Sequence, residues 1–512
     1  MTADASLSAR TIIVGAGIGG LAAALRLRAA GEDVLVLERA AEVGGKMRTV
    51  PSKGLAVDTG PTVLTMKWVF DDLFAAIGAR LDDHLTLIAE PHLARHWWPD
   101  GAMLDLWQDR AKSAAEIGGV FGPGARADYE RFAAEAERLF TAFDAPMMRT
   151  AAPSPTALTA RVLREPSLIP AIAPLRSLAQ KLSKSFRDPH LRQLFGRYAT
   201  YVGGSPYKSP AILSLISHSE AAGVWRPKGG MHALARALRA LADARGVVFE
   251  TGAEVTRIET QDGRVVAAHC GPTRHACAQL VFNGDPRALA TGLLGRAAEG
   301  ATAAKPLNAR SLSARVWAFA SAVAGPELVY HNVFFGADPR AEFDPIARGE
   351  MPTDPTLYIC AEDRGTGVTP PQVERFEIIM NAAPLSAATP QSQEIDTCRS
   401  LTFATLKRFG LTFQTAPPDH ALTTPQGWES LFPGSDGSLY GQSPHGMMAA
   451  FQRPTARTAV PGLYLVGGGA HPGAGVPMAT LSALHVAEAI AQDRISTSTS
   501  RPTATHGGMS TA

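Results

Sequence analysis

The sequence has few cysteines, little net charge and no long apolar run. Its cysteines (Cys270, Cys277, Cys360 and Cys398) are scattered through 512 residues without a Cys-x-x-Cys pair or a zinc-like spacing. This pattern argues against a disulfide framework or a metal site and favours a reducing, cytoplasmic setting. A formal net charge of only +2 argues against nucleic-acid binding, which needs a clustered excess of Lys and Arg.

Signals for secretion and for membrane spanning are also missing. The first ten residues, MTADASLSAR, contain no apolar segment of the kind that a secretory signal needs. No run of about 18 apolar residues is present, so we expect no membrane-spanning helix. Residues 494–512 are rich in Ser and Thr, and we expect a disordered tail there. A chain of 512 residues is too long for one ordinary core, so two or more domains are expected.

Near the start of the chain, a glycine loop joins a short apolar strand to a helix-forming segment. Gly15, Gly17 and Gly20 form the pattern G-x-G-x-x-G, and the next apolar strand ends on Glu38. In this pattern the first glycine allows a tight turn, the second lets the backbone approach a pyrophosphate, and the third lets helix and strand pack closely. Glu38 is placed to accept hydrogen bonds from ribose hydroxyls. A lone glycine pattern also occurs in chance turns, but the complete unit predicts a dinucleotide-binding site.

A second glycine pair, Gly44-Gly45, follows Glu38 within the segment ERAAEVGGKMR, and VDTGPTVL follows soon after it. Standing alone the pair predicts a surface turn, but its offset from Glu38 argues against that. The arrangement resembles the flavin-containing amine oxidase and phytoene desaturase superfamily, where E-[RK]-x(4)-GG-[KR] extends the FAD site. The resemblance assigns FAD contacts in this part of the chain to Gly15, Gly17, Gly20, Glu38, Arg39, Gly44, Gly45, Lys46, Arg48, Gly60, Pro61 and Thr62.

Another loop rich in glycine and proline lies near the other end, in LYLVGGGAHPGAGVPMATL. In the superfamily, the last part of a discontinuous FAD domain is a strand, a glycine loop and a helix. The helix would point its N-terminus at the edge of the flavin where negative charge develops on reduction. The resemblance adds cofactor contacts from Gly468, Gly475, Val476, Pro477 and Met478. Val255, in a segment that we expect to form paired strands (246–260), would lie against the adenine.

The segments HPGAGVP, GSLYGQSPHG and FQRPTARTAVPGLYLVGG resemble carotenoid desaturases of the bacterial phytoene desaturase family, and the resemblance spans residues 11–490. Many phytoene desaturases have Thr and Gly where this chain has Ala470 and Met478, which favours the branch that acts on 1-hydroxycarotenoids. The resemblance implies an enzyme of carotenoid biosynthesis, in a photosynthetic bacterium. It would form a C3–C4 double bond in an acyclic 1-hydroxy or 1-methoxy carotenoid by hydride transfer to flavin N5. The alternatives are an early carotene desaturase that acts on phytoene, an amine oxidase, and a non-catalytic escort protein that binds isoprenoids.

The resemblance also implies the fold, an α/β Rossmann-like FAD-binding domain of the amine oxidase/phytoene desaturase type with a mixed α+β substrate domain. The FAD-binding domain would be discontinuous and comprise residues 1–100, 229–300 and 436–493. A helical substrate and membrane-contact region would occupy 101–228, and the substrate domain 301–435. A strand pair around Asp100-Gly101 is expected at the end of the first FAD segment.

The segment 156–208 is basic, and from residue 174 its apolar side chains Leu175, Leu178, Leu182 and Phe186 fall on one helical face. Such a helix is either a membrane-surface anchor or an ordinary helix packed on the core. Because a long polyene resides in the bilayer, the resemblance favours the anchor. It implies an enzyme bound peripherally to the cytoplasmic face of the inner or photosynthetic membrane, with oxygen or a quinone as electron acceptor.

His471 is the titratable residue of the glycine- and proline-rich loop near the C-terminus. An imidazole with an ordinary pKa near 6.5 suits a proton acceptor. The alternative, which we favour, is that its ring bonds loop carbonyls. His218, His232 and His445 are weaker candidates for the same role.

Overall fold

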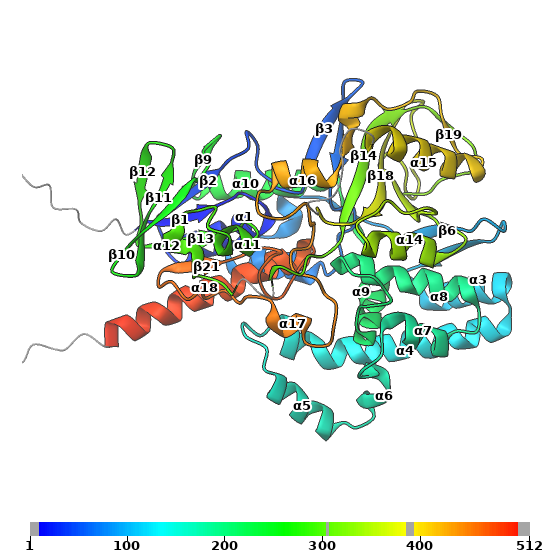
Figure 1. Ribbon diagram of the computed structural model, residues 1–512, viewed down its shortest axis with the longest axis horizontal. Coiled ribbons are helices and arrows are strands. Elements are labelled where there is room, and N and C mark those ends of the chain that lie inside the picture. The colour runs from blue at the N-terminus through cyan, green and yellow to red at the C-terminus, as the bar shows by residue number, and fades with distance from the viewer. Residues whose placement is uncertain (1–9, 304–306, 386–393, 500–512) are drawn as a thin grey trace, which may run out of the picture.

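A parallel sheet of five strands lies at one end of the computed structural model, which describes residues 10–303, 307–385 and 394–499 (Figure 1). The strand order is β21 (Leu463–Leu465), β13 (Gln279–Phe282), β1 (Thr11–Val14), β2 (Val34–Glu38) and β9 (Val248–Thr251). Strands β1, β2 and β13 are buried along nearly their whole length, as is typical of parallel strands that are covered on both faces. The sheet therefore unites stretches of chain that are far apart in the sequence.

Helices cover one face of this sheet, and a smaller antiparallel sheet covers the other. Ile13 and Val36 pack into the helical layer, whereas Ile12 and Leu35 pack into the opposite layer, because successive strand residues point to opposite faces. The helical layer consists of α1 (Ile18–Ala29), α2 (Trp68–Ala76), α10 (Met231–Ala244) and α18 (Val476–Thr499). The opposite layer consists of β10 (Arg257–Gln261), β11 (Arg264–Cys270), β12 (Thr273–Ala276), α11 (Pro286–Ala290) and α12 (Arg296–Glu299).

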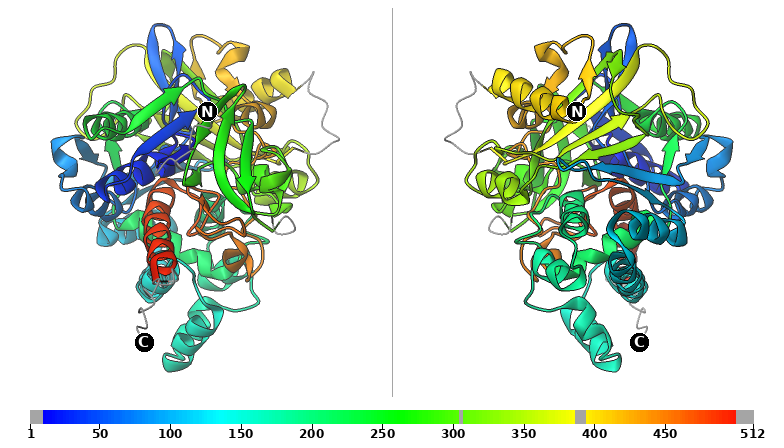
Figure 2. Two further views of the ribbon diagram at one scale, coloured as in Figure 1. Left: turned by 90° about the vertical axis from the view of Figure 1, so that its left-hand side faces the viewer. Right: turned by 90° about the vertical axis from the view of Figure 1, so that its right-hand side faces the viewer.

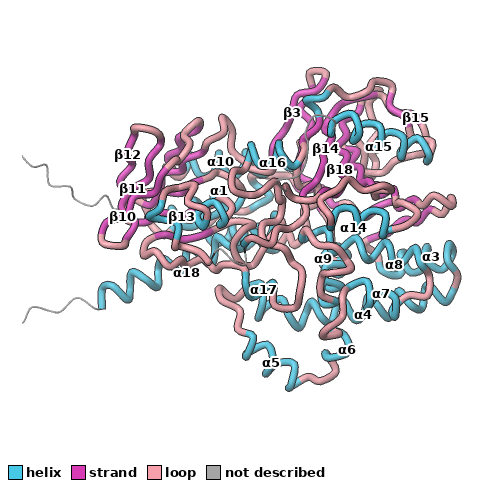
Figure 3. The backbone as a smooth tube through the Cα atoms, viewed as in Figure 1, coloured by secondary structure: helices cyan, strands magenta, loops and turns pink. Residues whose placement is uncertain are grey.

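A second group of strands lies at the other end of the molecule, with loops between the two groups (Figure 3). Of the described strands, seven form this mixed sheet, in the order β20 (Leu422–Thr423), β14 (Ser313–Ser321), β18 (Glu374–Ala382), β17 (Leu357–Ala361), β16 (His331–Phe334), β6 (His92–Trp97) and β7 (Met103–Trp107). Helix α15 (Glu394–Arg408) packs on one face, where Phe334 and Ile359 lie in the same apolar cluster as Leu406.

A helical region covers the other face of the seven-stranded sheet. There Val333 and Phe335 join an apolar cluster with Phe132, Phe186 and Phe195. The region comprises α3 (Arg110–Phe121), α4 (Pro123–Phe143), α5 (Pro155–Arg164), α6 (Leu168–Ile172), α7 (Leu178–Ser185), α8 (Pro189–Gly196), the 3-10 helix η3 (Arg197–Val202) and α9 (Ile216–Ala221). Smaller elements include β3 (Arg48–Ser52), β4 (Leu55–Thr59), β5 (Leu87–Ala89), β8 (Trp225–Pro227), α14 (Pro339–Ala347), β15 (Val323–Ala324), α16 (Pro425–Leu431), α17 (Ala449–Gln452) and β19 (Thr412–Phe413).

Two strand pairings differ from those expected. The hairpin around Asp100-Gly101 exists as β6–β7, but both strands belong to the seven-stranded sheet and not to the parallel sheet. Strands β9 and β10 do not pair with each other: β9 joins the parallel sheet beside β2, and β10 joins β11. The local sequence predicted the strands, whereas their partners depend on contacts between distant segments.

The predicted start of the disordered tail, at residue 494, is too early in the sequence. Helix α18 continues to Thr499, so residues 494–499 are helical, and the remainder of the expected tail (500–512) lies outside the described residues. Arg494 forms an ion pair with the buried carboxylate of Glu32, which ties the end of this helix to the sheet. No described helix is long and apolar enough to cross a membrane, as expected.

The apolar stripe of the segment 156–208 (Leu175, Leu178, Leu182 and Phe186) does not form the predicted membrane anchor. Leu178, Leu182 and Phe186 are buried in the core beneath the seven-stranded sheet, whereas Leu175 lies before α7 and is 92% exposed. Lys181, from the same helix, is buried and pairs with Glu135 at 2.6 Å. The stripe therefore packs on the core, which was the ordinary alternative.

Candidate active site

The glycine loops meet at one edge of the parallel sheet. Since β1, β2, β13 and β21 are parallel, their carboxyl ends lie at the same edge, where ligands bind in open α/β sheets. Gly15 follows β1, Glu38 ends β2, Asn283 follows β13 and Gly467 lies two residues after β21. The two loops that the sequence singled out are therefore neighbours in space.

The first glycine loop has the geometry that a dinucleotide site requires. Gly15 has a φ of +97°, which L side chains rarely adopt. A Cβ on Gly20 would lie 2.1 Å from the carbonyl oxygen of Gly15, so only glycine allows the helix to pack this closely. The carboxylate of Glu38 accepts hydrogen bonds from the N–H groups of Ala16 at 2.6 Å and Ala40 at 2.8 Å, which fixes it beside the loop.

The second glycine pair lies directly against the first loop. The N–H of Gly44 donates to the carbonyl of Ala16 at 2.9 Å, and a Cβ on Gly45 would lie 3.1 Å from the Cα of Gly17. Gly60 is equally constrained, since its Cβ would lie 1.9 Å from the carbonyl oxygen of Lys46. Its N–H donates to Glu377 of the seven-stranded sheet at 2.6 Å, which joins the two ends of the molecule.

Asn283 is a residue whose role the sequence did not reveal. Its Nδ2 donates to the carbonyl of Gly15 at 3.0 Å, and a Cβ on Gly467 would lie 2.3 Å from its Oδ1. The side chain therefore holds the N-terminal loop and the C-terminal loop together. Its place directly after a four-residue apolar strand was the available signal, because that position puts it at the ligand-binding edge of the sheet.

The N-terminus of α1 fits the pyrophosphate of FAD. No side chain caps it, whereas Asp58 accepts from the first N–H groups of α10 and Asp109 from those of α3. An uncapped first turn offers free N–H groups and the positive end of the helix dipole to an anion. Together with the glycine cradle and the Glu38 carboxylate, these groups suit a dinucleotide.

Partly buried basic side chains contact the C-terminal loop and the neighbouring loop 434–442. Arg453 donates to the carbonyl of Gly468 at 2.6 Å, and Lys46 donates to the carbonyl of Leu439 at 2.5 Å. Burial lowers the pKa of Lys46 to about 8 and that of Arg453 to about 10. Both nevertheless remain largely charged at neutral pH. The loop therefore lies in a positive local field, which suits an anionic cofactor.

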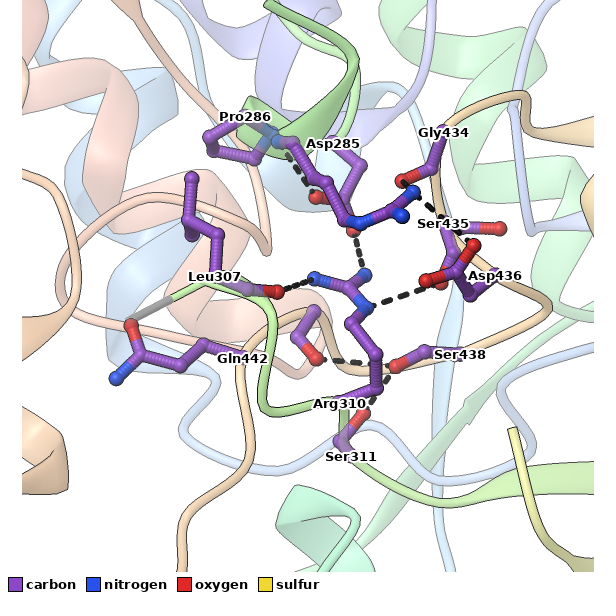
Figure 4. Close-up of polar contacts among 12 residues, drawn as sticks. Asp285, Pro286, Leu307, Arg310, Ser311, Gly434, Ser435, Asp436, Ser438 and Gln442 are labelled. Atoms are coloured by element: carbon purple, nitrogen blue, oxygen red, sulfur yellow. Dashed lines mark hydrogen bonds and ion pairs between the residues drawn. The ribbon is translucent and has the colours of Figure 1, made fainter. Parts of the chain in front are cut away.

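Arg310 lies at the centre of a network of polar contacts close to the loop 434–442 (Figure 4). It forms an ion pair with Asp285 and donates to the carbonyls of Ser435 and Leu307, both at 3.1 Å. Arg287 pairs with Asp436 at 3.0 Å beside it. The network joins the segment after β13 to the loop 434–442, which carries the carbonyl that holds Lys46.

The remaining predicted contacts lie in varied surroundings. Arg39 is exposed and donates to the carbonyls of Ser430 and Leu431, and Arg48 donates to Thr423 at 2.8 Å and lies over the ring of Trp428. Val255 is buried in the apolar layer opposite the helices. The hydroxyl of Thr62, next to Pro61, accepts from Tyr358. Gly475 is exposed, Val476 and Pro477 are buried in the first turn of α18, and Met478 is half-buried. As contacts to FAD, these residues remain predictions.

His471 is buried and bonds a loop carbonyl. Its Nε2 lies 2.8 Å from the carbonyl oxygen of Thr150, and burial lowers the pKa of the ring to about 4. A neutral imidazole whose Nε2 carries the proton can donate this bond but cannot accept a proton there. The geometry supports the structural interpretation.

The other histidines considered as bases are similarly engaged. The Nε2 of His445 accepts from the N–H of Ser205 at 3.0 Å, and burial lowers its pKa to about 4. His232 lies 3.0 Å from the carbonyl of Val43 through Nε2, and His218 packs against the ring of Phe140.

Comparisons with known proteins agree with this geometry. A family model described as flavin containing amine oxidoreductase matches residues 18–491. A hydroxyneurosporene desaturase from Cereibacter sphaeroides is 52% identical over 96% of this chain and 99% of its own length. One from Rhodobacter capsulatus is 49% identical over 95% of this chain and 98% of its own length. The solved structure of putrescine oxidase bound to putrescine covers 95% of this chain and 99% of its own, with a TM-score of 0.58 at 15% identity. This likeness concerns the fold alone, and it confirms the predicted fold class.

Proposed function

Because the chain belongs to the family of flavin-containing amine oxidoreductases, we propose that it is an FAD-dependent carotenoid desaturase. It forms the C3–C4 double bond of an acyclic carotenoid that carries a hydroxyl or methoxy group on carbon 1. The observation that carries this proposal is the high identity to hydroxyneurosporene desaturases along nearly the whole chain. The glycine cradle, the fixed Glu38 carboxylate and the uncapped α1 supply the site for FAD.

The reaction removes two hydrogens from a saturated C–C bond beside a conjugated polyene. FAD, when bound, supplies the two-electron acceptor. Carbon 4 is allylic, so positive charge that develops there spreads over the polyene, and little acid–base assistance is needed. The chain's own residues orient the substrate, exclude water and hold positive charge beside the C-terminal loop through Lys46 and Arg453.

A patch of exposed apolar side chains supports peripheral binding to a membrane surface. We define the apolar tip as Leu163, Ile169, Leu175, Met447 and Met448, all exposed, with Leu163 at 70% and Leu175 at 92%. The N–H of Leu175 lies 3.4 Å from the sulfur of Met447, so these two members of the tip adjoin. Helix α5 projects from the body in each view (Figure 2). Exposed apolar groups of this size mark interaction sites, and a C40 polyene must be collected from a bilayer.

Basic side chains accompany the apolar tip. Arg161, Arg164 and Arg176 are exposed on and near α5 and α6, as a membrane with anionic lipids favours. The proposal therefore places the enzyme on the cytoplasmic face of the inner or photosynthetic membrane, although the core-packed stripe of α7 is not the anchor. Oxygen and a membrane quinone remain the two candidate electron acceptors.

Anaerobic reduction of the FAD-loaded protein tests the function. The protein is mixed with liposomes that contain either a 1-hydroxy acyclic carotenoid or phytoene, and flavin bleaching and products are followed. Bleaching with the hydroxylated substrate and one new 3,4 double bond support the proposal. Bleaching with phytoene would instead identify the protein as an early carotene desaturase. Protein that takes up no FAD would instead favour a non-catalytic escort, and readmitting oxygen or a quinone identifies the acceptor.

A further inference from the structure

A row of buried polar side chains crosses the seven-stranded sheet on the face that the helical region covers. His331, Cys360 and Glu377 lie opposite one another on β16, β17 and β18, so their side chains share this face. Tyr358 lies two residues before Cys360 on the same face. A site for a pure hydrocarbon needs no such groups, and burying them costs free energy unless they find partners.

Tyr358 links this row to the predicted FAD site. The hydroxyl of Tyr358 donates to Oγ1 of Thr62 at 2.8 Å and lies 2.6 Å from Nδ1 of His331. When Tyr358 donates to Thr62, the proton between Tyr358 and His331 belongs to Nδ1, and this tautomer leaves the lone pair on Nε2. Burial lowers the pKa of His331 to about 3, so the ring is neutral and its Nε2 carries a lone pair.

That lone pair has no partner. The Nε2 of His331 is buried and forms no hydrogen bond within the described residues. A buried polar group without a partner is uncommon in a folded protein and calls for an explanation. Here the unpartnered atom belongs to a side chain that is only 2% exposed and is linked through Tyr358 to Thr62.

A donor faces the same region from the helical side. Arg197 donates through Nη1 to the hydroxyl of Tyr201 at 3.1 Å, but its Nε and Nη2 make no hydrogen bond in the part of the chain that is described. The carboxylate of Glu220 lies 3.8 Å from Nη2 and balances its charge. The guanidinium lies over the rings of Tyr198 and Tyr201. Those rings pack in the same apolar cluster as Val333 and Tyr358, and the charge of Arg197 adds to burial in lowering the pKa of His331.

We propose that Nε2 of His331 and the guanidinium of Arg197 bind the C1 hydroxyl of the carotenoid. The hydroxyl donates to the imidazole lone pair and accepts from the arginine, so both buried groups are satisfied. Carbon 1 is only two bonds from carbon 3, so a group that recognises this hydroxyl must lie beside the reacting bond and not at the far end of the substrate site. Thr62, a predicted FAD contact, is linked to His331 through Tyr358, which supports a position of this subsite near the flavin.

The inference rests on the proposed function and predicts the order in which three kinds of carotenoid bind. A 1-methoxy carotenoid accepts from Arg197 but has no hydrogen for His331. An unsubstituted hydrocarbon end leaves both groups unpaired, and a site built to hydrogen-bond a hydroxyl strongly rejects an analogue that lacks it. The expected order of affinity is hydroxy, then methoxy, then hydrocarbon.

Equilibrium binding tests the ranking without any turnover. FAD-loaded protein is titrated with 1-hydroxy, 1-methoxy and unsubstituted acyclic carotenoids of equal length, and binding is followed by the shift of carotenoid absorption. Wild-type protein should bind the hydroxy compound about 10- to 100-fold more tightly than the hydrocarbon. His331→Phe should remove most of that preference, whereas His331→Gln, whose amide oxygen replaces Nε2 as acceptor, should keep it within a few-fold.

The possible outcomes distinguish failure of the hydroxyl-binding subsite from failure of the proposed function. Equal binding of hydroxy and hydrocarbon compounds to wild-type protein would overturn the inference, as would a folded, FAD-containing His331→Phe protein with unchanged preference. Discrimination in binding without flavin bleaching by any of the three carotenoids would leave the subsite standing and reject the proposed function. Because the wild-type ranking needs no variant, failure of His331→Phe to fold does not remove the test.

Discussion

Asn283 donates a hydrogen bond from Nδ2 to the main-chain carbonyl of Gly15 at 3.0 Å, across 268 positions of sequence. The same side chain leaves no room for a Cβ on Gly467. One amide therefore sets the distance between the two loops that we predict to hold the cofactor. Any substitution that moves it should act on FAD binding before it acts on the substrate.

Asn283→Asp should weaken FAD binding about 10- to 100-fold, because it replaces the donor with a carboxylate that faces a carbonyl oxygen. Quenching of flavin fluorescence on titration of the FAD-free protein measures the dissociation constant. Asn308→Asp, at an exposed position, is the matched control and should bind FAD like the wild type. Equal affinity of both variants would contradict the role of Asn283.

Gly20→Ala should destabilise the protein by about 1–3 kcal/mol, since the new methyl group would meet the carbonyl of Gly15 at 2.1 Å and must push α1 away from β1. Gly119→Ala is the control, because that helical position is exposed with nothing near its Cβ, and it should stabilise by about 0.5–1 kcal/mol. Urea unfolding measures both. A Gly20→Ala protein as stable as the wild type would mean that the helix does not pack as described.

His471→Gln should retain activity within about tenfold, because the glutamine amide can still donate to Thr150. A proton acceptor at this position would instead make the loss about 100- to 10,000-fold. Single-turnover flavin reduction with the hydroxylated carotenoid distinguishes the two roles.

The same substitution should change stability in acid. Burial lowers the pKa of His471 to about 4, so between pH 6.5 and 4 the unfolded chain binds a proton that the folded chain does not. This group therefore makes the wild type lose stability as pH falls through that window, on the order of 1–3 kcal/mol in total, with no further loss below pH 4. His471→Gln should lose less stability between pH 6.5 and 4, whereas the control His420→Gln, at an exposed site, should follow the wild type.

Replacing Leu163 and Leu175 by Ser should weaken binding to anionic liposomes by about tenfold for each leucine, since each removes exposed apolar surface from the apolar tip. Co-flotation with liposomes measures the partition. Val368→Ser removes an exposed apolar group that is not part of the tip and should leave partition unchanged. If all three variants float alike, the tip is not the membrane contact.

The sequence predicted the parts of the site that depend on local geometry. Gly15, Gly20 and Glu38 lie where the spacing placed them, because a strand, a tight turn and a helix leave few alternatives. The partners of the strands were harder to predict. The local sequence assigned β6 to the first domain, and only its long-range pairing with β16 places it in the seven-stranded sheet. The buried polar row was not predictable either, since His331 and Tyr358 come from separate strands whose register no local pattern reveals.

The apolar stripe that we predicted to be a membrane anchor is a second example of this limit. Leu178, Leu182 and Phe186 have the spacing of an amphipathic helix, and that spacing fits an anchor and a core helix equally well. The deciding fact is what covers the stripe, which depends on residues such as Phe132 and Phe195 from other helices.

The strand order of the parallel sheet also constrains when the protein can mature in the cell. Its edge strand β21 and the loop after it come from the end of the chain, whereas β1 and β2 leave the ribosome first. At ordinary rates of synthesis, about 20 to 90 seconds separate Glu38 from Val476. During that interval the nascent chain has only half of the predicted cofactor cradle, and once β13 is made its edge stays unpaired until β21 follows. FAD loading is therefore a late event in biogenesis, and a chain that stalls before β21 should remain without flavin and depend on chaperones.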